Sequence, residues 1–160
     1  MLHTSLGYIL ARSFPEEIIV LFIGCYFLNL KVPVKTLLQK GLALGLVVSL
    51  IRMLPISFGI HTIIGMACIL FVLVELSKDS FINCIMAICK VILCLTLSEG
   101  IYIYLLTGLF NVPEKLLVYN YTITGAIYTL PSLGIVVLLA FLLEFCIRKI
   151  HGGKFIKRNG

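Results

Sequence analysis

Long apolar stretches dominate this chain, and five of them can cross a lipid bilayer as helices. The hydrocarbon core of a bilayer is about 30 Å thick, and an α-helix needs about 20 residues to span it. Apolar types make up 61% of the 160 residues and the mean hydropathy is +1.14, whereas soluble domains contain roughly 45–50% apolar residues. The sequence therefore predicts an all-α, polytopic integral membrane protein of the cell membrane, with residues 1–160 in a single transmembrane domain.

Turn-forming and charged residues divide the apolar sequence into its spans. We expect five transmembrane helices at about residues 13–30, 36–54, 58–76, 81–109 and 128–147. Asn111, Pro113 and Glu114 mark the start of a further helix over residues 112–120, because these types favour the first turn, and we expect it to lie along the membrane surface. Residues 2–11 either form a second surface helix or extend the first span, and the sequence leaves both arrangements open.

The basic residues gather at one end of the expected helices. Five spans place nine of them on the side of the C-terminus and three on the other side, with Lys90 inside the membrane. The nine are Lys31, Lys35, Lys40, Lys78, Arg148, Lys149, Lys154, Lys157 and Arg158, and the three are Arg12, Arg52 and Lys115. Short cytoplasmic loops of membrane proteins are rich in Lys and Arg. The count predicts an N-terminus outside and a cytoplasmic C-terminus.

Charge and cysteine content argue against several classes of function. The formal net charge is +6, but the basic residues flank the spans, where anionic lipid headgroups attract them. We therefore expect the lipid bilayer, and not nucleic acid, as the partner of these residues. The six cysteines lie in apolar runs, without a C-x-x-C pair or a His/Cys cluster at zinc spacing. We expect no metal site and no cofactor.

Ionisable side chains inside the expected spans are candidate functional residues, because each costs about 2.5–3.5 kcal/mol at the middle of a membrane helix. Lys90 lies near the midplane of the fourth span. Glu99 lies nine residues further on, which turns the helix by about 180° and points the two side chains in opposite directions. Arg52, at the outer end of the second span, is the expected partner of Glu99, and Lys90 either reaches toward the inner interface or contacts Glu144.

Further polar side chains lie at the depth of Arg52. The sequence predicts a polar cluster that opens to the outside and contains Arg52, His61, Glu99, Glu16 and Glu17. Such a cluster either locks the helices in register or binds an external ligand.

His61 and Cys68 define a different hypothesis, since a Cys–His pair in a membrane can act as a peptidase. The arrangement resembles the accessory-gene-regulator peptidases that process quorum-sensing propeptides, which also place a His before a Cys in an apolar region. Seven residues of straight helix separate the two side chains by about 10 Å, too far for proton transfer without a break in the helix. We therefore do not expect an enzyme, and the peptidase remains the enzymatic alternative.

The segment Ile51-Arg52-Met53-Leu54-Pro55-Ile56-Ser57-Phe58-Gly59-Ile60-His61-Thr62 resembles the multi-span membrane segments of bacterial sensor histidine kinases of the sporulation-phosphotransferase and accessory-gene-regulator sensor type. The resemblance implies a module of a bacterial inner membrane that senses an external peptide, lipid or envelope signal. Those receptors continue into a kinase portion, whereas this sequence ends at Gly160. A signalling role is therefore expected to need another membrane protein or a separate signalling or ATPase subunit.

Two functions follow as expectations. The first is a receptor-like or accessory membrane module that uses the outward polar cluster. The alternative is a transport component, because substrate-binding subunits of energy-coupled vitamin transporters resemble this chain in size and hydropathy.

Overall fold

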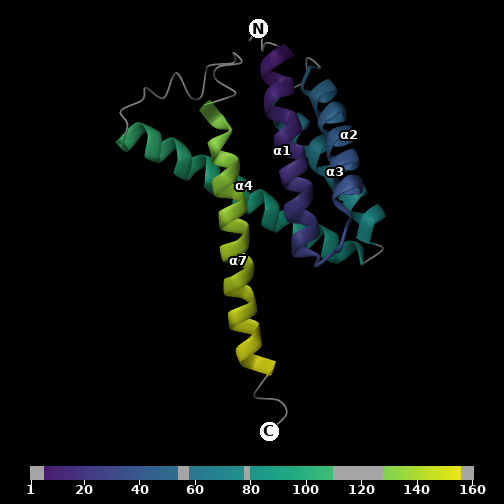
Figure 1. Cartoon of the computed structure of the whole chain (residues 1–160), viewed down its shortest axis with the longest axis vertical. Coiled ribbons are helices and arrows are strands. Elements are labelled where there is room, and N and C mark those ends of the chain that lie inside the picture. Colours follow the sequence, from purple (N-terminus) through teal and green to yellow (C-terminus); the bar gives the residue numbers. More distant parts are fainter. Residues whose placement is uncertain (1–5, 54–57, 78–79, 110–127, 156–160) are drawn as a thin grey trace.

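A computed structural model describes residues 6–53, 58–77, 80–109 and 128–155, and these residues form an all-helical bundle. Its helices are α1 (Leu6–Phe27), α2 (Val34–Met53), α3 (Phe58–Ser77), α4 (Phe81–Leu109) and α7 (Pro131–Phe155). Successive helices run in alternating directions, and the two termini lie at opposite ends of the bundle (Figure 1). The predicted all-α class is confirmed for the described part of the chain.

Three of the described helices are long and apolar enough to cross a membrane: Val34–Met53, Phe81–Gly108 and Pro131–Lys149. A shorter apolar helical stretch, Ile63–Ser77, lies in α3. Large apolar side chains also cover the outside of the bundle, where Phe71 is 73% and Ile82 is 69% exposed. An apolar exterior is costly in water and is the expected surface of a helix that faces lipid.

The first helix is longer than the span predicted over residues 13–30. α1 begins at Leu6 and continues through Pro15 to Phe27. Of the two arrangements that the sequence leaves open, the structure therefore has the continuous helix for residues 6–11. The surface helix predicted over residues 112–120 lies outside the described residues.

α1 occupies the centre of the bundle, because it is the helix that packs against each of the four other described helices. One face of α1 packs with α4 and α7 around Val20, Ile23, Val91 and Val136. The other face packs with α2, α3 and α4 around Leu21 and Leu73. A change in the position of α1 therefore reaches every other helix in the described part of the fold.

α1 and α2 approach most closely at two glycines. A Cβ atom on Gly41 would lie 2.8 Å from Cγ1 and 3.0 Å from Cα of Ile18, and one on Gly45 would lie 2.8 Å from Cδ1 of Phe14. Small residues spaced by four allow the backbones of two membrane helices to come this close. The G-x-x-x-G motif of α2 thus packs α2 against α1 within the same chain.

α4 crosses the bundle at a steep angle to the other helices (Figure 1). It contains 29 residues, which is about 43 Å of helix at about 1.5 Å per residue. A helix longer than the roughly 30 Å of hydrocarbon tilts to keep its apolar residues in lipid. The first turns of α4 lie beside the end of α1 (Figure 1).

Candidate functional site

Charged side chains from three helices meet at the end of the bundle where α1 begins. We name this group the Glu16 cluster, and it contains Arg12, Ser13 and Glu16 of α1, Arg52 of α2 and Glu99 of α4. The three α1 residues lie on one helix face, because positions three and four apart are neighbours on a helix surface. The cluster therefore fastens α2 and α4 to the same turn of α1.

Glu16 lies between two arginines. Its Oε2 is 3.5 Å from Nε of Arg12, and its Oε1 is 3.2 Å from Nη2 of Arg52. Arg52 also donates a hydrogen bond of 3.1 Å from Nη1 to the Ser13 hydroxyl. The second arginine, Arg12, forms an ion pair with Glu99. Because the Glu16 side chain is only 9% exposed, these contacts compensate a carboxylate that has lost most of its hydration.

Glu17 adds a second carboxylate beside the cluster, and one of its two oxygens lacks a hydrogen-bond partner among the described residues. The residue is 4% exposed, and its Oε2 is buried without a hydrogen-bond partner among the residues that the structure describes. Glu17 lies close enough to Glu16 and Arg52 for both charges to act on it. With Glu17 included, three carboxylates face two guanidinium groups, so the site has a surplus of one negative charge when all five are ionised.

Arg52, Glu16 and Glu99 belong to one connected network, but the predicted pair between Arg52 and Glu99 is wrong. Arg52 pairs with Glu16, and Glu99 pairs with Arg12. Arg12 belongs to the network although it is not among the predicted members of the cluster. Its spacing of four residues from Glu16 was the available signal, since opposite charges at i and i+4 meet on a helix surface.

His61 lies on α3, which packs against both α1 and α2. The ion pairs of the Glu16 cluster are made by Arg12, Glu16, Arg52 and Glu99, so His61 is not one of the residues that form them. Its proposed partner in a peptidase, Cys68, packs among apolar side chains that include Leu21, Leu44 and Leu73. α3 is continuous from Phe58 to Ser77, and this unbroken helix keeps His61 and Cys68 about 10 Å apart along its axis.

A second charged group, the Glu144 cluster, lies at the opposite end of α1 and contains Asn29, Lys90, Glu144 and Arg148. Glu144 Oε1 is 2.9 Å from Nε of Arg148, and its Oε2 is 3.9 Å from Nζ of Lys90. Nη2 of Arg148 donates a 2.6 Å hydrogen bond to Oδ1 of Asn29. The contact between Lys90 and Glu144, one of two arrangements expected from the sequence, is therefore present.

The position of Asn29 follows from the way α1 ends. Asn29 has a φ of 54°, a left-handed conformation that Asn adopts more readily than most residues. The backbone N–H of Leu30 donates to the carbonyl oxygen of Cys25 at 2.9 Å. The backbone N–H of Asn29 donates to the carbonyl oxygen of Tyr26 at 3.0 Å. These two bonds form a Schellman motif, which caps a helix C-terminus. The cap holds the Asn29 side chain where Arg148 of α7 reaches it.

Lys90, which the sequence places near the middle of a membrane span, lies within the candidate span Phe81–Gly108 and beside the end of α1. Its ammonium lies 5.2 Å from the ring centre of Phe27, the last residue of α1. Lys90 therefore lies near the end of the bundle that also contains Asn29 and Arg148.

Comparison with protein-family models, with curated proteins and with solved structures gives no match to this chain.

Proposed function

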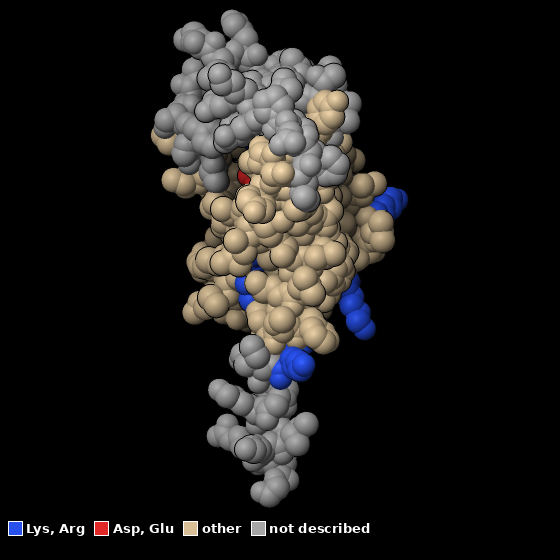
Figure 2. Space-filling model, turned by 90° about the vertical axis from the view of Figure 1, so that its left-hand side faces the viewer, with Lys and Arg blue, Asp and Glu red and all other residues tan. Residues whose placement is uncertain are grey.

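We propose that this chain is a five-span membrane protein of receptor or accessory type, with its N-terminus outside, and that the Glu16 cluster and Glu17 form its ligand site. The three apolar helices, the apolar exterior and the concentration of Lys and Arg toward the C-terminus support the membrane assignment. In the side view of Figure 2, the Lys and Arg side chains lie mostly in the lower half, toward the end at which α7 ends. A carboxylate is visible in the upper half.

The observation on which the proposal depends is the buried carboxylate of Glu17. A carboxylate without partners costs several kcal/mol in a low-dielectric interior. A cluster that served only to hold helices together would gain from an apolar residue at this position. A ligand with a positively charged group, such as an amine, would compensate Glu17 when bound, while Arg12 and Arg52 keep the neighbouring carboxylates in place.

A ligand at this position has a direct structural route to the rest of the molecule. Glu17 belongs to α1, which packs against α2, α3, α4 and α7. Pairing of Glu17 with a cation changes the charge balance around Arg52, and so favours a different position of α2 relative to α1. The response then passes to a separate membrane or signalling subunit, which is the expected partner.

Exchanging each of two adjacent carboxylates distinguishes a ligand site from a structural lock. We expect Glu17→Gln to leave the stability of the ligand-free protein unchanged or to raise it by about 1 kcal/mol, because an unpaired buried charge is removed. Glu16→Gln, the matched control, removes a paired carboxylate and lowers stability. Unfolding by sodium dodecyl sulfate, followed by circular dichroism, measures both. An equal loss in the two variants would show that Glu17 is structural.

Binding is tested with n-butylamine as the probe. A ligand that binds only the folded state raises the unfolding midpoint, so butylammonium should raise that of the wild-type protein more than sodium chloride of equal ionic strength. The same addition should leave Glu17→Gln unchanged. A rise of equal size in both proteins, or in neither, would contradict a cation site at Glu17.

The proposed orientation is tested separately by labelling of exposed lysines. Lys35 and Lys149 are both solvent-exposed and belong to the side that we place in the cytoplasm. A membrane-impermeant amine reagent should modify them in permeabilised cells and leave them unmodified in intact cells. Modification in intact cells would reverse the orientation.

A further inference from the structure

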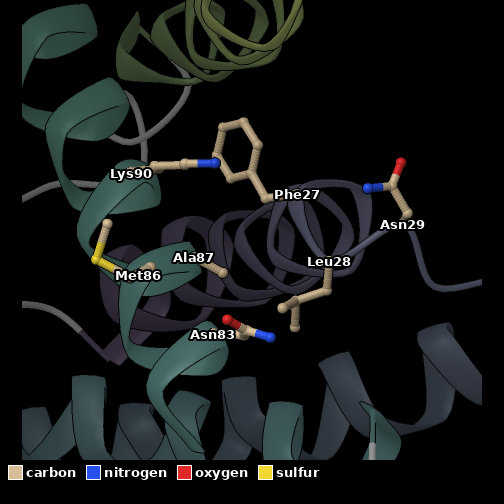
Figure 3. Close-up of a pocket in the computed structure, with 7 residues that line it drawn as sticks. All are labelled: Phe27, Leu28, Asn29, Asn83, Met86, Ala87 and Lys90. Atoms are coloured by element: carbon tan, nitrogen blue, oxygen red, sulfur yellow. The ribbon is translucent and has the colours of Figure 1, made fainter. Parts of the chain in front are cut away.

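A pocket lies between the end of α1 and the first half of α4. Its volume is about 240 Å³, and it is lined by Phe27, Leu28, Asn29, Asn83, Met86, Ala87 and Lys90. Figure 3 shows Lys90 extending from α4 toward the ring of Phe27, with the α1 terminus on the facing side. The pocket has room for several water molecules, at about 30 Å³ each, and therefore for a small polar headgroup.

Lys90 has hydrogen-bond donors at this pocket that the protein does not use. An ammonium group has three N–H donors. Its contact with Glu144 Oε2 is 3.9 Å, which is longer than a hydrogen bond. Its other contact is with the face of Phe27, and no acceptor among the described residues lies within hydrogen-bond distance of Nζ. The side chain is only 28% exposed, so bulk water compensates it in part.

The charges around the pocket leave a positive surplus. Glu144 is shared by Lys90 and Arg148, so two cations face one carboxylate. The Arg148 side chain is 58% exposed and is tied to Asn29, a lining residue. An anion in the pocket would therefore meet the Lys90 ammonium directly and lie near the Arg148 guanidinium.

The pocket opens beside a surface suited to lipid tails. Met86 lines the pocket and is 57% exposed, and Phe81, Ile82 and Ile85 of the same helix are also exposed. A ligand that combines an anionic headgroup with an apolar tail fits both features, because the head reaches Lys90 and the tail covers α4. Basic pockets between helices at the cytoplasmic side of a membrane bind the headgroups of anionic lipids in this way.

We propose that this pocket binds the phosphate headgroup of an anionic phospholipid, with Lys90 as its hydrogen-bond donor and Arg148 as the second cation. The proposal requires the chain to lie in a membrane. It does not depend on what the Glu16 cluster binds, since the two groups lie at opposite ends of α1.

The test measures lipid retained by the full chain after extraction from phosphatidylcholine vesicles that contain phosphatidylglycerol. Native mass spectrometry should find phosphatidylglycerol bound to the wild-type protein in preference to phosphatidylcholine. Lys90→Gln should weaken this binding about five-fold, the effect of one basic residue near an anionic lipid surface. Lys40→Gln is the matched control, because Lys40 pairs with Glu75 on helices α2 and α3 and does not line the pocket. It should bind phosphatidylglycerol as the wild type does.

A second variant keeps the test decisive if Lys90→Gln does not fold. Asn83 lines the pocket at an exposed position of α4, and Asn83→Asp adds a negative charge there without removing an ion pair. It should also reduce retained phosphatidylglycerol. Equal binding by wild type and both pocket variants would overturn the site. Binding of inorganic phosphate by the wild type without any Lys90-dependent retention of phosphatidylglycerol would overturn it too, because the pocket would then take free phosphate and not a phospholipid.

Discussion

The Glu16 and Glu144 clusters have the same central arrangement but opposite surplus charge. In each, a buried glutamate lies between two basic side chains, and one of those basic side chains also binds a polar residue, Ser13 or Asn29. Glu17 and Glu99 give the Glu16 cluster an excess of carboxylates. The Glu144 cluster has an excess of cations.

The clusters also differ in the exposed fraction of their basic side chains. Arg12 and Arg52 have side chains that are 24% and 33% exposed, whereas Arg148 is 58% exposed. Loss of the central carboxylate thus leaves two poorly hydrated cations in one cluster, and one poorly hydrated and one well hydrated cation in the other. Similar ion pairs thus join helices near both ends of α1, while their surroundings set the strength of each cluster and the ligand charge that it attracts.

The largest expected effect on stability is that of Glu16→Gln, which removes the central carboxylate of the Glu16 cluster. The change leaves both arginines without their shared carboxylate in a partly buried site. We expect the free energy of unfolding to fall by about 3 kcal/mol, the lower end for breaking a buried ion pair. The measurement is a denaturation curve in sodium dodecyl sulfate.

The control for this prediction is Glu75→Gln. Glu75 accepts from Lys40 at 2.7 Å, but its side chain is 50% exposed, and exposed ion pairs contribute about 0–1 kcal/mol. If Glu16→Gln proved as mild as Glu75→Gln, the Glu16 cluster would contribute no more to stability than an exposed ion pair.

A smaller loss of stability is expected from Gly41→Ala, which tests the contact between Gly41 of α2 and Ile18 of α1. The new Cβ would lie 3.0 Å from the backbone Cα of Ile18, so α1 and α2 must separate and Arg52 is drawn away from Glu16. Overpacking of this kind costs about 1–3 kcal/mol, and we expect about 2 kcal/mol in the same denaturation curves.

Gly134→Ala is the matched control on α7, the helix that contributes Glu144. A Cβ there meets nothing within 4 Å, and alanine is the better helix former by up to about 1 kcal/mol. We expect this variant to be as stable as the wild type or slightly more so. Equal losses at Gly41 and Gly134 would show that the close contact of α1 with α2 does not set the stability of this end.

The sequence predicts three of the five described helices closely, because the signals that end them are local. Three predicted spans, 36–54, 58–76 and 81–109, lie within two residues of α2, α3 and α4 at each end. Turn residues and charges interrupt the apolar runs there, and such breaks end helices whatever the tertiary packing. Gly41 and Gly45 are small residues four apart, a spacing that permits close helix packing, and the structure identifies Ile18 and Phe14 as their partners.

The site is predicted only in part because its pairs depend on packing. Arg12 and Glu99 are 87 residues apart in sequence, and no local pattern says which of two arginines reaches Glu99. What the sequence does give is the set of costly buried charges, because any ionisable residue in an apolar run needs a partner.

The smallest expected effect, that of Glu144→Gln, decides whether the two clusters differ as proposed. The change removes the carboxylate shared by Lys90 and Arg148, but the exposed Arg148 keeps its hydration and its bond to Asn29. Glu144 is buried, but its closer partner Arg148 is 58% exposed, so we expect a loss of about 1 kcal/mol, the upper end for pairs with an exposed partner and about a third of the loss in Glu16→Gln. Anionic lipid should reduce it further, because phosphate replaces the lost carboxylate as the partner of both cations. Denaturation with and without phosphatidylglycerol in the micelles measures both effects. A loss as large as that of Glu16→Gln, insensitive to the lipid, would mean that both clusters are structural locks of equal strength.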